Sequence, residues 1–274
     1  FCSGLYVVAL ALPLALWKSI GLSLGETFAL ATQDLRKSGG QLWVLAIAFL
    51  VLLGGGFVFF SIMEDKSGDT GVDIVREYRN APKALVGEGS GYAKGASNPR
   101  VTIIEFADLE CPACRKEAGE LRALMKKYPN DVRLVFRHYP LDQTCNRELG
   151  RQIHKFACGA AVAAECAGVE GKFFEYMEKI YTPWGEAHGG LDRPSLERHA
   201  AELGLNAASF KACLDQPGPV FAKIQEDIRE ANFIGVGSTP TLVVNQRKMT
   251  GVIDLPKWEK ILESEGVAVI AGPK

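Results

Sequence analysis

Two long runs without a charged side chain dominate the first 63 residues. The first covers 17 residues from Phe1 to Trp17, and the second covers 26 from Ser38 to Met63. A helix rises about 1.5 Å per residue, so the second run reaches about 39 Å, more than the hydrocarbon core of about 30 Å. The first run is shorter, but Lys18 can extend its charge to the interface and apolar residues continue to Leu24. We therefore predict a membrane segment over residues 1–63, with transmembrane helices at about 4–24 and 39–63.

Charges beside these runs predict the orientation of the chain. The three basic side chains of this segment lie on the connector between the runs, whereas three acidic side chains follow the second run: Lys18, Arg36, Lys37, and then Glu64, Asp65, Asp69. The positive-inside rule places the connector in the cytoplasm and everything after residue 63 outside. We therefore expect the protein in the inner membrane, with its seven cysteines in an oxidising, periplasm-like space where disulfides persist.

After residue 63 the pattern is typical of a mixed α/β domain. Residues 64–99 hold many glycines and charges and are predicted to be a linker, with a short helix near 72–78. Apolar and polar positions then predict a strand, a helix and a strand, a long helical stretch over about 145–233, and finally two strands and a helix. The boundaries are 101–106, 112–128, 132–137, then 241–245, 247–253 and 256–265. Residues 64–274 carry 28 basic and 30 acidic side chains, which disfavours binding to nucleic acid.

The sequence Cys111-Pro112-Ala113-Cys114 stands between the first predicted strand and helix of this domain. Proline fits the first helical turn, and residues three apart on a helix share one face. Unpaired N–H groups at a helix N-terminus favour a thiolate, so Cys111 is predicted to be the exposed nucleophile and Cys114 its resolving partner. A zinc site is disfavoured because no second pair of ligands has matching spacing. A purely structural bridge is disfavoured because it closes too short a loop to add much stability.

Four further cysteines lie in the long helical stretch. Cys145 lies in a predicted loop and Cys158 begins a helix, so a second disulfide between them is one interpretation. Cys166 and Cys213 fall on apolar helical faces, where small buried side chains are the default interpretation and a bridge is the alternative. The four histidines share no spacing typical of metal ligands, so we interpret them as surface or satisfied core residues and predict no metal: His138, His154, His188 and His199.

The order of elements and the dithiol resemble the thioredoxin fold with an inserted helical domain, as in disulfide oxidoreductases of the DsbA type. The segments VTIIEFADLECPACR, VRLVFRHYPLD, AAVAAECAGVEGKFFEYMEKIY and GVGSTPTLVV carry this resemblance over about residues 98–265. It implies a DsbA-like domain at 100–266 whose helical insertion is the stretch at 145–233.

The resemblance also implies roles for residues around the dithiol. A cis peptide at Thr239-Pro240 would hold an extended substrate beside Cys111, with Pro112 and Ala113 lining the same site. Glu105 would be a buried acid behind the second cysteine, with a raised pKa that lets it exchange a proton with that thiol. An exposed glutamate at a strand edge is the alternative. Strong oxidants of this type carry a histidine inside the motif, so alanine at position 113 predicts a less oxidising dithiol.

The first run has a resemblance of its own. CSGLYVVALALPLALW is similar to the last membrane helix of the vitamin K epoxide reductase family, in which the second cysteine of a C-x-x-C pair stands four residues before a tyrosine. Cys2 stands in that relation to Tyr6. The resemblance implies that Cys2 relays electrons to a quinone, that the other cysteine of its pair precedes Phe1, and that the chain is a fragment of a longer protein.

Together these observations predict a membrane-tethered thiol-disulfide oxidoreductase that oxidises secreted or periplasmic protein thiols. Cys111, Cys114 and Glu105 would perform the exchange, and electrons would pass through Cys2 to a quinone in the intact protein. Membrane lipid and substrate protein thiols are the predicted partners. A reductase or isomerase is the alternative enzyme, and a membrane-anchored binding or chaperone module with a structural C-x-x-C is the alternative from another class.

Overall fold

The computed structural model describes residues 71–181 and 190–270 of the 274-residue chain. The chain divides into two compact units, 1–69 and 70–274. The predicted membrane segment, both of its helices and Cys2 lie outside the described residues. Among the helices that the structure describes, none is long and apolar enough to cross a membrane.

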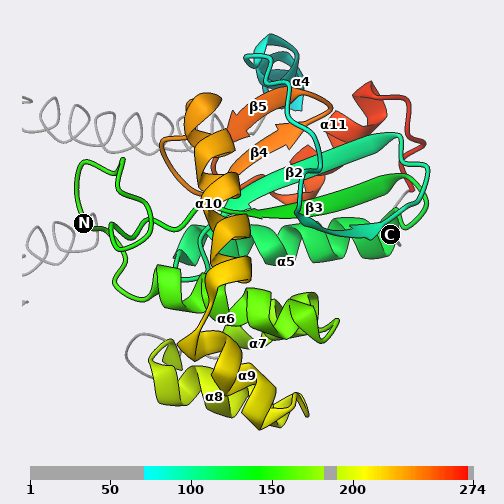
Figure 1. Ribbon diagram of the computed structural model, residues 1–274. Helices are drawn as coiled ribbons and strands as arrows, with labels where there is room; N and C mark the ends of the chain where they lie inside the picture. The colour runs from blue at the N-terminus through cyan, green and yellow to red at the C-terminus, as the bar shows by residue number, and fades with distance from the viewer. Residues whose placement is uncertain (1–70, 182–189, 271–274) are drawn as a thin grey trace, which may run out of the picture. The chain divides into compact units, whose positions relative to one another are not determined.

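A five-stranded sheet forms the centre of the described unit (Figure 1). The strand order is β1-β3-β2-β4-β5, with β2 and β3 parallel and every other neighbouring pair antiparallel. The central strand β2 is buried along almost its whole length, as expected for a strand covered on both faces. The strands are β1 (Tyr92–Gly95), β2 (Val101–Ala107), β3 (Val132–His138), β4 (Thr241–Val244) and β5 (Arg247–Thr250).

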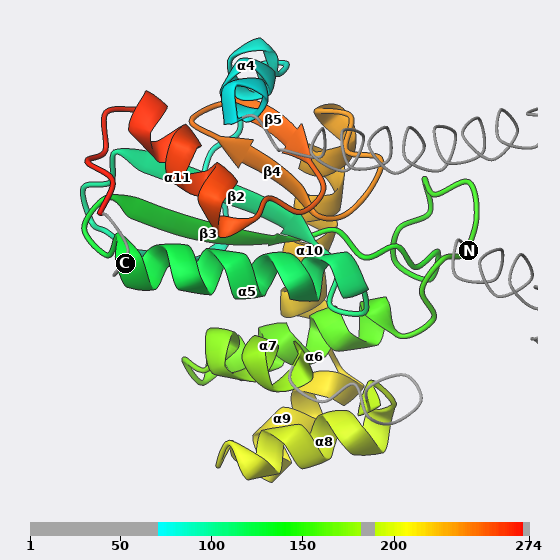
Figure 2. The same ribbon diagram turned by 180° about the vertical axis from the view of Figure 1, so that it is seen from behind.

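Helices cover both faces of this sheet. Figure 2 shows α5 (Pro112–Lys127) and α11 (Leu255–Ser264) in front of one face, and Figure 1 shows α10 (Gly218–Phe233) in front of the other. α5 connects the parallel strands β2 and β3, which is the crossover that a parallel pair requires. The sequence prediction of an α/β thioredoxin fold with a helical insertion is confirmed for this part of the chain.

The insertion consists of packed helices, which Figures 1 and 2 show below α5. The loop at 145–156 comes first, so the helices begin later than the predicted stretch at 145–233. They are α6 (Ala157–Val169), α7 (Phe173–Tyr181), α8 (Arg193–Glu202) and α9 (Ala207–Asp215), and α10 then returns the chain to the sheet. α6 is almost entirely buried because its many alanines let neighbouring helices approach on every side.

The short helix predicted near residues 72–78 is confirmed, but the described part of the predicted linker at 64–99 packs on the domain instead of forming a free tether. α4 (Gly71–Asn80) packs on α11, burying Ile74 and Tyr78, and the hydroxyl of Tyr78 donates to Glu265 at 2.9 Å. Strand β1 pairs with the edge of β3. Ile74 and Tyr78 are four residues apart and therefore lie on one face of α4, so both side chains can pack into the core although the rest of the helix is polar.

Both cysteine pairs of the insertion are disulfides. Cys145 and Cys158 are bridged across the loop that precedes α6, with Cα atoms 6.0 Å apart. Cys166 and Cys213 are bridged between α6 and α9, with Cα atoms 5.9 Å apart. The default interpretation of Cys166 and Cys213 as free buried side chains is therefore wrong, because α6 and α9 pack with these two positions facing each other.

Candidate functional site

The dithiol lies where β2 ends and α5 begins. Cys111 is the N-cap residue of α5, with extended backbone, and Pro112 occupies the first helical position. Proline there loses no hydrogen bond because the first N–H groups of a helix have no partner within it. Cys111 and Cys114 are both free thiols, with 7% and 0% of their surface exposed. Cys111 is thus the more accessible of the two but less exposed than the sequence suggested.

The surroundings of Cys111 favour its thiolate and lower its pKa to about 5. The largest cause is a hydrogen bond from the thiol of Cys114, which outweighs the opposing effect of burial. The Thr239 side chain and the backbone N–H groups of Cys114 and Ala113 lower the pKa further, although the Cys111 side chain makes no capping hydrogen bond. At pH 7 the thiolate therefore exceeds the thiol about a hundredfold.

Cys114 has the opposite character. Burial raises its pKa well above the ordinary thiol value, and its hydrogen bond to Cys111 and the charges of Cys111 and Glu105 raise it further. The backbone N–H of Asp108 donates to its sulfur at 3.4 Å. The reduced site therefore holds one thiolate and one thiol, and the thiolate is on the residue nearer the surface.

The loop before β4 faces Cys111. The Thr239–Pro240 peptide is cis, and the Cys111 sulfur lies 3.5 Å from the carbonyl oxygen of Thr239. The Thr239 hydroxyl is buried and has no hydrogen-bond partner among the described residues. The carbonyl of Pro240 accepts the N–H of Gly251, which ties the loop to the residue after β5. The structure thus brings the predicted residues Thr239 and Pro240 beside the dithiol, together with Pro112 and Ala113 on α5.

Glu105 lies on β2, buried to 1% exposure, so the alternative of an exposed strand-edge glutamate is wrong. Burial raises the pKa of its carboxyl well above the ordinary value, and the nearby charges of Glu117 and Cys111 add to the rise. Its Oε1 atom has no hydrogen-bond partner among the described residues. The charge of Glu105 is also among the causes that raise the pKa of Cys114.

A second buried acid, Glu117 on α5, was not expected from the sequence. Its carboxylate accepts the backbone N–H of Ile253 at 2.8 Å and the indole N–H of Trp258 at 3.0 Å. Burial raises its pKa to about 7 despite these two bonds. The sequence spacing could have predicted this burial. Glu117 follows Cys114 by three residues and precedes Leu121 by four, so it lies on the apolar face of α5.

Asp108 was also missed by sequence reasoning. Its buried carboxylate accepts the N–H groups of Glu110 at 2.6 Å and Leu141 at 2.7 Å, and it meets the His154 ring at 2.8 Å. Its position between a strand end and the first cysteine is a signal for this role, because a short acid there can accept N–H groups of the following turn.

The three histidines that the structure describes do not form a metal site. His138 is buried 3.3 Å from Glu165, and His199 lies 3.2 Å from the carbonyl of Gly190. Within residues 71–181 and 190–270, no three His, Cys, Asp or Glu side chains are arranged to hold a metal ion. His188 lies outside the described residues.

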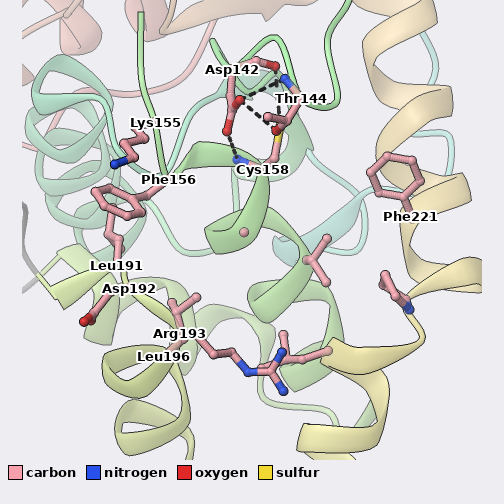
Figure 3. Close-up of a pocket in the computed structure, with 14 residues that line it drawn as sticks. Asp142, Thr144, Lys155, Phe156, Cys158, Leu191, Asp192, Arg193, Leu196 and Phe221 are labelled. Atoms are coloured by element: carbon pink, nitrogen blue, oxygen red, sulfur yellow. Dashed lines mark hydrogen bonds between the residues drawn. The ribbon is translucent and has the colours of Figure 1, made fainter.

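A separate cavity of about 390 Å³ lies in the insertion, beside the Cys145–Cys158 disulfide (Figure 3). Its wall is mostly apolar, with Asp142 and Thr144 at one side. Neither the dithiol nor the Thr239–Pro240 loop lines it. Apolar residues from the loop before α6 and from α6, α8 and α10 include Phe156, Val162, Leu196 and Phe221.

Comparisons with known proteins agree with this geometry. A thioredoxin-like oxidoreductase from Silicibacter pomeroyi has 25% identity and a TM-score of 0.54, over 65% of this chain and 94% of its own. DsbA2 of Pseudomonas aeruginosa has 28% identity and a TM-score of 0.50, over 66% of this chain and 96% of its own.

A curated relative matches a longer part of the chain. This protein from Herminiimonas arsenicoxydans, named Na(+)/H(+) antiporter NhaA, is 27% identical over 248 residues, which cover 89% of this chain. The chain spans about a third of that relative, because the match covers 35% of its length.

A match to a protein family model shows the family of this chain. Residues 88–264 match the family described as thioredoxin, and they include the dithiol, the Thr239–Pro240 loop and the helical insertion. The chain therefore belongs to the thioredoxin family, as a DsbA-like thiol-disulfide oxidoreductase whose C-x-x-C pair is Cys111 and Cys114.

Proposed function

We propose that this chain oxidises the thiols of proteins exported from the cytoplasm, using the Cys111–Cys114 disulfide as the oxidant. The observation that carries the proposal is the lowered pKa of Cys111, about 5. A stabilised thiolate stabilises the reduced dithiol, and a stable reduced form makes its disulfide a strong oxidant. The value lies between about 7 for thioredoxin, a reductant, and about 3.5 for DsbA, an oxidant. The dithiol should accordingly be oxidising, but less so than the strongest members of its class.

The reaction takes place in two exchanges. A substrate thiolate attacks the sulfur of Cys111, the Cys111–Cys114 bond breaks, and Cys114 leaves with the electron pair and takes up a proton because its pKa is high. A second substrate thiolate then attacks the substrate sulfur of the mixed disulfide, and Cys111 leaves as a thiolate. The substrate loses two electrons and two protons; one proton stays on Cys114, and the other passes to solvent.

Glu105 is the proposed proton donor for Cys114. Burial raises the pKa of its carboxyl well above the ordinary value, which favours the protonated form, and its charge acts on that thiol. A buried neutral acid can supply a proton to a leaving thiolate without water entering the site. The substrate peptide is proposed to lie along the Thr239–Pro240 loop, whose Thr239 carbonyl already faces Cys111.

A redox titration of the Cys111–Cys114 pair in the full chain, against glutathione, tests the function. We expect a potential more oxidising than that of thioredoxin and rapid oxidation of a reduced, unfolded model protein. A reducing potential would instead support the reductase or isomerase, and absence of exchange would support a structural pair. The Cys166→Ala/Cys213→Ala double variant is a matched control, because it removes a distant bridge and should leave the potential unchanged.

We further propose that electrons leave the domain through Cys2 and pass to a quinone at the inner membrane. The support is the similarity of residues 2–17 to the vitamin K epoxide reductase family and the charge pattern that places residues 64–274 outside the cytoplasm. In native membranes that contain the intact, longer protein, Cys2→Ala should stop quinone-dependent reoxidation of the dithiol and leave exchange with glutathione intact. Unchanged reoxidation would exclude this route.

A further inference from the structure

The carboxylate of Asp108 joins three parts of the chain beside the dithiol. It accepts backbone N–H groups from Glu110 on its own turn and from Leu141 on the loop after β3. The Leu141 N–H donates to the Oδ2 atom, and the Nδ1–H of His154 donates to this atom as well, at 2.8 Å. Asp108 is 1% exposed, and a carboxyl group that is buried needs hydrogen-bond partners of this kind.

The backbone of Asp108 contacts both cysteines. Its N–H donates to the sulfur of Cys114 at 3.4 Å, and its carbonyl accepts the N–H of Cys111 at 3.1 Å. The hydroxyl of Tyr181 donates to the same carbonyl at 3.3 Å. Asp108 therefore contacts His154 through its side chain and both cysteines through its backbone.

His154 is held in place by a loop that a disulfide closes. The loop lies between Cys145 and Cys158, and the backbone N–H of His154 donates to the carbonyl of Leu141 at 3.0 Å. At the end of the loop Asp142 accepts the N–H of Cys158, a bond that Figure 3 shows. The His154 side chain keeps 17% exposure, so it can exchange protons with solvent.

The charged groups around His154 favour its protonated form. The pKa of His154 is raised, first by its hydrogen bond to Asp108 and then by the charges of Asp108, Glu110 and the Cys111 thiolate, against the effect of burial. Just before the loop, the buried Asp142 accepts hydrogen bonds from Thr144, Gln152 and Cys158. On the loop itself, Arg151 and Lys155 are exposed. Tyr181, from α7, remains protonated because its pKa is raised.

We propose that His154 is a positioning residue for the dithiol: paired with Asp108 as an imidazolium, it supplies from the loop at 145–156 the positive charge that alanine at position 113 does not. The interaction couples the reactivity of Cys111 to the protonation of His154. The inference rests on the proposed function only in taking Cys111 as the reactive thiolate.

The expected size of the coupling is modest. Hydrogen bonds from Cys114 and the Thr239–Pro240 loop, together with neighbouring N–H groups, are the main causes of the low pKa of Cys111. Asp108 also cancels part of the imidazolium charge. We therefore expect His154 to change the thiolate equilibrium of Cys111 by about three- to tenfold, which is about half to one pKa unit.

The unmodified chain provides the first test, because the coupling between two titrating groups is reciprocal. The full chain contains four histidines, so 13C labelling of histidine in detergent-solubilised protein gives a simple spectrum. We expect the pKa of His154 to be higher by about half to one unit in the reduced protein, where Cys111 is a thiolate, than in the oxidised protein, where it carries no charge. Equal values in the two states, or a lower value in the reduced one, would overturn the proposal.

Two substitutions at one position separate charge from structure. His154→Asn keeps a side-chain donor without the charge and should raise the pKa of Cys111 by about half to one unit. His154→Lys keeps a charge near Asp108 and should leave the thiolate equilibrium within about twofold of wild type. His199→Asn is the matched control, because His199 lies on α8 against the Gly190 carbonyl and should not affect Cys111.

The ultraviolet absorbance of the thiolate against pH measures these effects. No rise in the Asn variant, or equal rises in the Asn and Lys variants, would overturn the proposal, because a purely structural loop would not distinguish them by charge. If neither variant folds, the histidine titration of the unmodified chain decides. The proposed function fails separately, by a reducing potential in the redox titration.

Discussion

Replacing Cys114 with alanine should raise the pKa of Cys111, because the thiol of Cys114 is the main donor that stabilises the thiolate. A hydrogen bond to a charged group contributes about 1.5–3 kcal/mol. One pKa unit corresponds to about 1.4 kcal/mol, so losing this bond should raise the pKa by about one to two units. We therefore expect a value of about 6–7 in Cys114→Ala, against about 5 in the wild-type protein.

Cys114→Ser is the matched control for this prediction. Its hydroxyl can still donate to the Cys111 thiolate, so the pKa should rise by less than half as much as in the alanine variant. Serine also leaves the Asp108 N–H with an acceptor in place of the Cys114 sulfur. The two variants therefore differ mainly in the hydrogen bond to Cys111.

Two measurements apply to the reduced full chain. The first is thiolate absorbance against pH, and the second is the rate of alkylation by iodoacetamide, which follows the thiolate fraction. At pH 6 about nine tenths of Cys111 should be thiolate in the wild type and about a quarter in Cys114→Ala, so alkylation should slow about fourfold. Both variants should also accumulate mixed disulfides with substrate, because the resolving thiol is gone. A pKa of about 5 in Cys114→Ala, or equal rises in the two variants, would refute the hydrogen-bond argument and leave the helix N-terminus as the cause.

Three further predictions concern charge in and around the site. Ala113→His should lower the pKa of Cys111 below about 5 and make the potential more oxidising; thiolate absorbance tests this, and an unchanged or raised pKa would contradict it. The raised pKa of Glu117, about 7, means that the folded state holds a proton that the unfolded state releases above about pH 4.5, so stability falls as pH rises through this window. Glu117→Gln should remove a fall of up to about 3 kcal/mol between pH 4.5 and 7, measured by denaturant unfolding, and an unchanged slope would assign the fall to other groups. Asp227→Ala should cost about 3–5 kcal/mol because it leaves the fully buried Arg137 without its main partner; a loss below about 1 kcal/mol would show that the remaining partners suffice.

The part of the fold that could be predicted from the sequence is the part set by local patterns. The strand before Cys111, the helix after it and the first strand after Pro240 each have a clear period and a clear boundary, and the structure places them within one residue of the prediction. The last strand begins where predicted but ends at Thr250, three residues before the predicted boundary. β1 was missed because its four residues, Tyr92–Gly95, become a strand only through pairing with β3. α4 was expected as a short helix, but its packing on the domain was missed because only two of its side chains are buried in the core.

The site also contains residues that could be predicted from the local sequence and residues that could not. The roles expected for Cys111 and Pro112 follow from neighbouring residues, and Thr239–Pro240 required a family resemblance to place it opposite the dithiol. Asp108 meets His154 across 46 residues, and Glu117 meets Trp258 across 141, so no local pattern connects them. The bridge between Cys166 and Cys213 depends on how two helices rotate against each other, which a sequence of apolar positions leaves open.

The asymmetry of the two thiols follows from one feature, the start of α5. At the N-cap, Cys111 receives the Cys114 hydrogen bond and faces unpaired N–H groups, so its charged form is stabilised. One turn further on, Cys114 is inside the core, where the same burial that excludes solvent disfavours a second charge. Reduction of the disulfide therefore adds two electrons but only one proton near neutral pH, and that proton must reach a sulfur with no exposed surface. A buried acid whose raised pKa favours its protonated form could meet this need, and we propose that Glu105, with an unpartnered oxygen among the described residues, is that acid.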